Sequence, residues 1–305
     1  MSAPQQPVDL PPAAQWRLQH SAQRGSAASS FLGPSGFVLL DELGFEPVGV
    51  VMGMAVMHIG GIQVAGWNTP RELEVYSNAL ATGTDLAITR LREEASALGA
   101  DGVQLHTKVT RTHIEGPEIE YQITGTAVRF RPKPGVLRAG DGGPFTHATS
   151  MLTLSQMMLR GWFPTCLAYG ICVYHLPHRT MRQSMGQTFQ NAEVPAFTEG
   201  WYTARETALG RMQGKAEMTR SQVVLGTDVT ELAGVHGDHS VEFIANGSGW
   251  VRRPDLMSLV PRADLTTIAL MEKDLMMTHN YEAPEHRQAM APPNQPRPPQ
   301  PPVSG

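Results

Sequence analysis

The chain has 305 residues, a formal net charge of −4 and a charged fraction of 17%. This composition is not that of a collagen, a coiled coil or a disulfide scaffold, and without a basic field, non-specific binding to nucleic acid lacks an electrostatic driving force. The length suggests about two domains. The longest apolar runs are about 11–12 residues, whereas a membrane-spanning helix needs about 20, so we expect no transmembrane segment.

Both ends of the chain are predicted to be disordered. Residues 1–30 are rich in Pro, Gln, Ala and Ser, and residues 284–305 are dominated by Pro, Gln and Asn. Such segments cannot bury enough apolar surface to offset the entropy lost on ordering. The tail contains PxxP spacing, so it is either an inert solvated segment or a ligand for a protein partner with an aromatic groove. The first residues lack the pattern of a signal peptide.

The two cysteines, Cys166 and Cys172, lie within a single apolar run that is typical of a strand. At about 3.3 Å per residue, they are about 20 Å apart, which is too far for a disulfide or a shared metal ion. We therefore expect two free thiols, and the simplest setting for them is the reducing cytoplasm.

Two stretches of the chain match each other in order. At a constant offset of 117 the matches are Pro47 with Pro164, Gly53 with Gly170, Val56 with Val173, and His58 with His175. Further matches downstream keep nearly the same spacing and include Arg90 with Arg211 and Glu120 with Glu242. Ordered matches of this kind predict two copies of one unit. We place the units at residues 31–132 and 147–254, joined by a Gly/Pro-rich linker at 133–146, with a C-terminal helical extension at 255–283.

Each unit is predicted to be β-α-β-β, which makes the fold class α/β (α+β), with mixed sheets. The first strand, residues 48–59, is almost continuously apolar, and this favours a strand covered on both faces. Thr69-Pro70 is typical of a helix start, Gly83 predicts a break or kink, and residues 99–102 predict the helix end. A hairpin then follows over residues 103–130. The helical crossover should make the first two strands parallel.

The helix and the closing strand of these units resemble the YbjQ-like family of heavy-metal-binding domains. The residues that carry the resemblance are Tyr202–Ala208 and Arg211-Met212, Arg90–Ala95, Ala97–Val103 and Gly125–Val128. The second unit departs from the pattern at Met218–Ser221, where the first has Leu-Gly-Ala. The resemblance implies a small α/β fold that assembles into rings, commonly pentamers.

Four histidines are candidate ligands for a divalent transition metal. His58 and His175 occupy matching strand ends, and His236 and His239 share a turn with Asp238. Histidine is the commonest metal ligand, and a turn with two His and one Asp can reach one ion if its backbone curls. Alternatively, the strand-end histidines cap the strands by hydrogen bonding, and the turn residues only keep the surface hydrated.

No catalytic or cofactor-binding residue is predicted, because the chain lacks the G-x-S-x-G and phosphate-loop patterns. The repeated pairs Arg90/Arg211 and Glu120/Glu242 predict ion pairs within the fold or between subunits. The methionines at 52, 54 and 57 are expected to fill the core rather than to bind a metal.

These observations favour a non-enzymatic protein that assembles with itself into a ring, because closure removes exposed strand edges. Either five chains would each place one unit in each of two layers, as in a pentamer, or three chains would form a pseudo-sixfold ring. The alternative function is a metal-ion-binding module that uses the four histidines.

Overall fold

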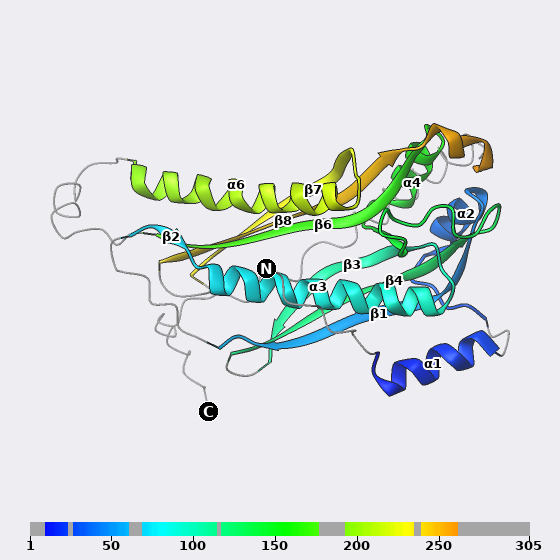
Figure 1. Cartoon of the computed structure of the whole chain (residues 1–305), viewed down its shortest axis with the longest axis horizontal. Helices are drawn as coiled ribbons and strands as arrows, with labels where there is room; N and C mark the ends of the chain where they lie inside the picture. The colour runs from blue at the N-terminus through cyan, green and yellow to red at the C-terminus, as the bar shows by residue number, and fades with distance from the viewer. Residues whose placement is uncertain are drawn as a thin grey trace, which may run out of the picture. The chain divides into compact units, whose positions relative to one another are not determined.

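The computed structural model describes residues 10–23, 27–60, 69–114, 117–176, 193–234 and 239–261. These residues fall within one compact unit, Met1–Ala263. The elements, labelled in Figure 1, are α1 (Pro12–Gln23), α2 (Pro34–Glu42), β1 (Phe45–His58), β2 (Arg71–Glu72), α3 (Glu74–Ala97), β3 (Gly102–His113), β4 (Glu118–Phe130), β5 (Phe145–His147), α4 (Met151–Met158), β6 (Trp162–His175), α6 (Pro195–Met218), β7 (Val223–Ala233), β8 (Ser240–Arg252) and the 3₁₀ helix η1 (Pro254–Leu259).

The strands form two four-stranded sheets, with the orders β1-β4-β3-β5 and β2-β6-β8-β7. We call them the first and the second sheet. Two β-α-β-β units are present, β1-α3-β3-β4 and β6-α6-β7-β8, so the predicted α/β fold class is confirmed. In the first unit β4 lies between β1 and β3 and is antiparallel to both. The first two strands are therefore parallel in direction, as expected, but they are not neighbours.

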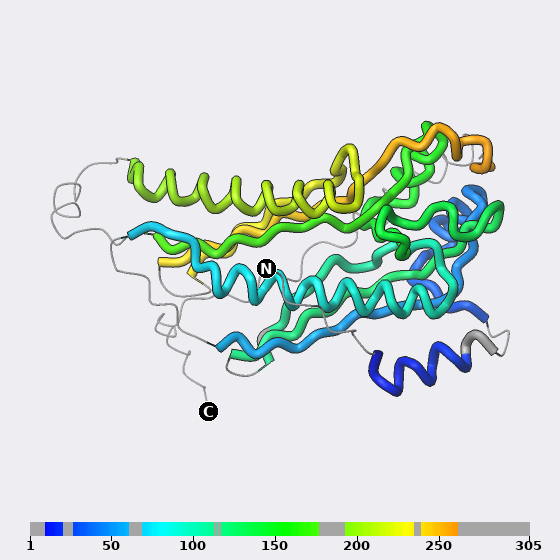
Figure 2. The backbone as a smooth tube through the Cα atoms, in the orientation of Figure 1, coloured from blue at the N-terminus to red at the C-terminus, as the bar shows by residue number. Residues whose placement is uncertain are grey.

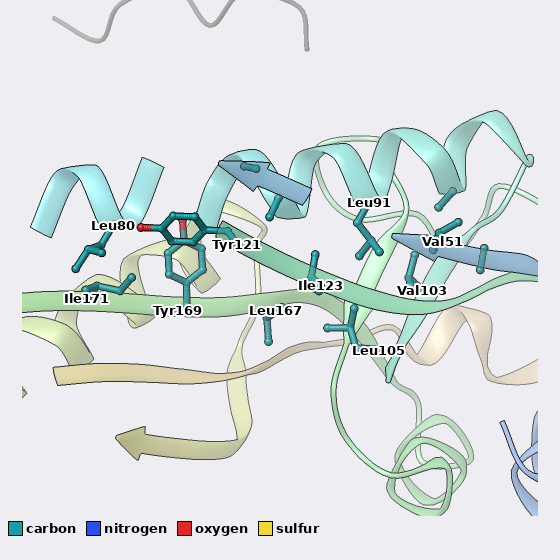
Figure 3. Close-up of a cluster of buried hydrophobic side chains, with 14 of the residues drawn as sticks. Val51, Leu80, Leu91, Val103, Leu105, Tyr121, Ile123, Leu167, Tyr169 and Ile171 are labelled. Atoms are coloured by element: carbon teal, nitrogen blue, oxygen red, sulfur yellow. The ribbon is translucent and has the colours of Figure 1, made fainter. Parts of the chain in front are cut away.

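Helix α3 lies between the two sheets, and α6 covers the opposite face of the second sheet (Figures 1 and 2). One hydrophobic core draws on both units: it contains Val51 and Leu91 from the first and Leu167 and Ile171 from the second, all buried (Figure 3). Each unit thus completes the packing of the other around α3.

Two tyrosines from different sheets meet α3 (Figure 3). The hydroxyl of Tyr169, on β6, donates a hydrogen bond of 3.1 Å to the carbonyl oxygen of Ala81. The ring of Tyr121, on β4, lies where a Cβ at Gly83 would be. Gly83 therefore makes room for an aromatic ring, and the predicted break or kink is wrong because α3 runs through this position as one helix.

The ends of α3 are set by different causes. Gly99 adopts φ 67° just after the helix, and its amide donates to Ser96, so the predicted end is confirmed as a glycine stop. The predicted start at Thr69 is wrong, because the helix begins at Glu74. The preceding residues Arg71 and Glu72 are instead held in β2 by pairing with β6.

The N-terminal segment differs from the expected disorder over part of its length, since residues 12–23 form α1. Leu18 is buried in the shared core, and Arg17 forms an ion pair of 2.6 Å with Glu94 on α3. These two contacts anchor the helix. Of the predicted C-terminal extension and Pro-rich tail, residues from 262 onward lie outside the described part of the chain.

Cys166 and Cys172 both lie on β6 and both are free, which confirms the prediction of two unpaired thiols. Burial raises the pKa of the Cys172 thiol to about 12, so this thiol stays protonated at neutral pH. Within the residues that the structure describes, no helix is both long enough and apolar enough to cross a membrane.

Candidate assembly surface

The outer edge of β6 is closed by a segment of the first unit. Glu72 of β2 lies opposite Tyr174 of β6. The amide of Leu73 donates to the carbonyl oxygen of Val173 at 2.8 Å, and the amide of Val173 donates to the hydroxyl of Ser77 at 2.9 Å. A strand of two residues and the first turn of α3 therefore occupy an edge that would otherwise expose unpaired backbone groups.

Ion pairs from α6 hold this segment in place. Both terminal nitrogens of Arg211 bind the carboxylate of Glu72, at 2.5 and 3.0 Å, and one of them also donates to the carbonyl oxygen of Ile171 at 2.6 Å. Lys215 forms a second pair with Asp85 on α3, at 2.7 Å. The helix of the second unit thus binds β2 and α3 of the first. We call this arrangement the internal contact.

Breaking the Arg211–Glu72 pair should weaken the internal contact by a measurable amount. We expect a coupling of about 1 kcal/mol in a double-mutant cycle of Glu72→Gln and Arg211→Met, because the pair is bidentate but partly exposed to solvent. The free energy of unfolding of the four proteins in urea gives this coupling. Strictly additive effects would show that the pair adds nothing to stability.

The sequence predicts that the matching arginines, Arg90 and Arg211, and the matching glutamates, Glu120 and Glu242, form ion pairs. The structure shows partners for two of these four residues. Arg211 pairs with Glu72, as described above. Glu242, on β8, pairs with Arg111 of β3 at 2.5 Å. In both pairs the partners come from different units, so these charges join the units to each other.

The face of β6 that packs on α3 has a solvent-exposed counterpart on β1. The buried set on β6 comprises Leu167, Tyr169, Ile171 and Val173. At the offset of 117, three of their counterparts are Met52, Met54 and Val56, which are 39, 39 and 53% exposed. The expectation that Met52 and Met54 fill the core of the chain is therefore wrong. Alternation along the strand turns Gly53 and Ala55 toward α3 and the larger side chains away from it.

The outer edge of β1 is covered for part of its length by side chains. Arg17 donates to the carbonyl oxygen of Val50 at 3.0 Å, the amide of Met52 donates to Glu94 at 3.0 Å, and Arg90 donates to the carbonyl oxygen of Met54 at 2.5 Å. Even-numbered residues thus direct their backbone groups outward, and the alternation extends this to Val56. Among the described residues, Val56 shows no hydrogen bonds like the two of Val173.

The structure describes three of the four candidate metal ligands, His58, His175 and His239. His58 ends β1 opposite Glu118, whereas His175 ends β6, in the other sheet. His236 lies outside the described residues, and the carbonyl oxygen of His239 accepts a hydrogen bond from Leu176. In the described ranges no group of three or more His, Cys, Asp or Glu side chains could hold a metal ion. The metal site stays a prediction.

Sequence reasoning missed the exposed apolar face of β1, although a signal for it was present. In residues 52–56 the large side chains of Met52, Met54 and Val56 alternate with Gly53 and Ala55, so the large and the small residues of this stretch lie on opposite faces. The continuous apolar run obscured this alternation, because both faces of the strand are apolar.

Comparisons with known proteins bear directly on identity. No family model matches the chain, and no solved structure matches it. Among curated proteins, the chain is similar to the encapsulin nanocompartment protein Rv1762c of Mycobacterium tuberculosis (strain ATCC 25618 / H37Rv), with 36% identity over 249 residues, which cover 81% of this chain and 93% of that protein. The resemblance to the YbjQ-like family is therefore wrong: the chain belongs to the family of encapsulin nanocompartment proteins.

Proposed function

We propose that this chain is a non-enzymatic assembly protein, many copies of which associate into a closed compartment. The related protein is named for a nanocompartment, and a compartment is built from many subunits with closed symmetry. The observation in the structure that carries the proposal is the apolar face of β1. Its methionines and Val56 are exposed in one chain, while their counterparts on β6 are buried.

An apolar strand with one open face needs a partner. Continuous apolar runs are typical of strands that are covered on both sides. Among the described residues, α3 packs on one face of β1, whereas Met52, Met54 and Val56 on the other face stay exposed. Exposed apolar residues that are grouped on one face mark a site of association. The part of the outer edge of β1 at Val56 adds a second reason, because no hydrogen bond covers it among the described residues and an open edge invites pairing with another chain.

The mass of the purified full-length protein tests the proposed function. We expect mass photometry at micromolar concentration to show particles many times heavier than the 33.2 kDa chain, and electron microscopy to show that they are closed. A plain monomer at that concentration would contradict assembly. Open filaments would contradict closure, since a head-to-tail contact that does not close grows without limit.

Several expectations from the sequence stay predictions. Nothing in the described residues favours the metal-binding alternative over assembly. A protein partner for the Pro-rich tail is a prediction about residues outside the described part of the chain. The number of chains in a ring, five or three, and the cytoplasmic location also stay predictions.

A further inference from the structure

We propose that β1 is the docking site for α6 and Glu193 of a second copy of this chain, in a head-to-tail contact that repeats the internal contact. Within one chain, α3 and Glu72 of the first unit pack on β6 of the second. Between chains, α6 and Glu193 of one copy would pack on β1 of the next. The inference rests on the proposed function and names the contact that produces it.

The receiving surface on β1 has the same construction as the occupied surface on β6. The strands correspond at every position at an offset of 117, since β1 spans Phe45–His58 and β6 spans Trp162–His175. Their pairing with the neighbouring strand also corresponds: Gly53 lies opposite Ile123, and Gly170 lies opposite Ala245. Equivalent backbone geometry thus presents two apolar faces, one of them buried and the other exposed.

The donating surface on α6 has exposed apolar groups where the contact requires them. The two helices correspond at an offset of 121, since α3 spans Glu74–Ala97 and α6 spans Pro195–Met218. Ala81, which receives the Tyr169 hydroxyl, corresponds to Tyr202, which is 54% exposed. On the neighbouring strand β7, Val229 is 39% exposed. An aromatic and an aliphatic side chain are thus available to cover the exposed methionines of β1.

The charges at the edge point to the same partner. Arg90 on α3 corresponds to Arg211 on α6. Arg90 donates to a carbonyl oxygen of β1, and Arg211 donates to the corresponding carbonyl oxygen of β6. Arg211 also binds Glu72, whereas Arg90 has no ion pair with a carboxylate in the described ranges, and its Nε is buried without a hydrogen-bond partner there. At the helix offset, the counterpart of Glu72 is Glu193, which is exposed. Glu193 of a second copy would form with Arg90 the ion pair that Glu72 forms with Arg211.

At one position of the internal contact the two units carry opposite charges, and an arginine of α1 compensates for this. Lys215, which binds Asp85 and lies 5.1 Å from the ring centre of Tyr169, corresponds to Glu94. An unpaired acid there would face Glu206 of the second copy, the counterpart of Asp85, which is paired with Arg205 of its own chain at 2.7 Å. Glu94 is instead paired with Arg17 at 2.6 Å. The guanidinium of Arg17 therefore places a positive charge next to Glu94, the position that corresponds to Lys215.

Disulfide trapping between two different variants tests the contact. Glu72 lies opposite Tyr174, so the proposal places Glu193 of one copy opposite Met57 of the next. The pair at 72 and 174 does not exchange backbone hydrogen bonds, and side chains approach most closely at such pairs. We therefore expect Met57→Cys and Glu193→Cys chains, co-expressed and mildly oxidised, to form a disulfide-linked dimer on a gel.

Controls separate this contact from chance oxidation. Each single variant alone should stay uncrosslinked, because a head-to-tail contact joins unlike surfaces. Replacing the Glu193→Cys partner by Met218→Cys, on the highly exposed last residue of α6, should abolish the crosslink with Met57→Cys. A crosslink in a single variant alone, or an equal one with Met218→Cys, would overturn the proposed geometry.

A charge exchange provides a second measurement in the full-length protein. Glu193 is exposed, and its carboxylate accepts one exposed hydrogen bond of 2.8 Å from Thr198. Glu193→Arg should therefore leave the fold intact while raising the concentration for half-assembly roughly tenfold or more. Combining it with Arg90→Glu should restore assembly. If wild-type protein assembles but neither the crosslink nor the restoration occurs, this contact is wrong and the proposed function stands. If wild-type protein is a monomer, the proposed function fails first.

Discussion

Replacing Gly53 with alanine is expected to lower the free energy of unfolding by about 3 kcal/mol, at the upper end of the usual cost of overpacking. A Cβ at this position would overlap the carbonyl oxygen of Ala87 and would lie 2.8 Å from the amide nitrogen of Leu91. Both atoms belong to the backbone of α3, so the whole helix would have to move away from β1. Urea denaturation of the variant and the wild-type protein measures the loss.

Two further glycines provide matched comparisons. Gly170 meets α6 in the same way, with a Cβ that would lie 2.6 Å from the amide nitrogen of Met212, so Gly170→Ala should cost a similar amount. Gly214 lies on α6 with no atom near its Cβ position, and Gly214→Ala should stabilise the protein by roughly 0.5–1 kcal/mol. Equal effects at Gly53 and Gly214 would show that helix–strand approach is not the constraint.

Local signals predicted much of the fold. The first strand was expected at residues 48–59 and forms at Phe45–His58, because a run of apolar residues bounded by turns is a strand signal in itself. The glycine stop at Gly99 was equally local. The matched glycines also behave alike, since Gly53 and Gly170 each allow a helix to approach the first strand of its unit.

Features that depend on distant residues were not visible in the sequence. β2 exists because Arg71 and Glu72 pair with β6, about a hundred residues further along the chain, so a local pattern indicated a helix start instead. The sequence predicts disorder where α1 forms, because the hydrophobic pattern of this helix is weak and its anchor, Leu18, is stabilising only through the core that the two units share.

The candidate site shows the same division. The sequence identified the matching arginines but not the partner of Arg211, which lies 139 residues away at Glu72. It also identified the apolar character of β1 but could not tell which face the rest of the chain would leave open. That distinction depends on α3 covering only one side of the first sheet, which is a consequence of the tertiary fold.

Mild acid is expected to destabilise the protein through His147. This histidine lies on β5 with no exposed surface, between the rings of Phe145 and Trp250, whose centroids are 5.9 and 6.1 Å from its own. Its Nδ1 lies 3.1 Å from the hydroxyl of Thr149, and its Nε2 has no hydrogen-bond partner among the described residues. Burial therefore lowers the pKa of His147 from 6.5 to about 3.

The direction of the pH effect follows from this lowered pKa. In the unfolded chain His147 takes up a proton near its ordinary pKa of 6.5, whereas in the folded chain it stays neutral down to about pH 3. The unfolded state thus binds more protons in this window, so its contribution to stability is complete above pH 6.5 and is lost as the pH falls toward 3. The expected slope is at most about 1.4 kcal/mol per pH unit.

Urea denaturation at pH 7, 6 and 5, at one protein concentration, measures the effect. From pH 7 to pH 5 we expect the wild-type protein to lose about 2 kcal/mol of unfolding free energy to this histidine. His147→Gln should be less stable at pH 7, because it loses packing against two aromatic rings, but it should lose less on acidification. His106→Gln, which removes an exposed histidine, is the control. If His147→Gln and the wild-type protein show parallel pH dependence, the buried imidazole is not the group whose protonation destabilises the fold.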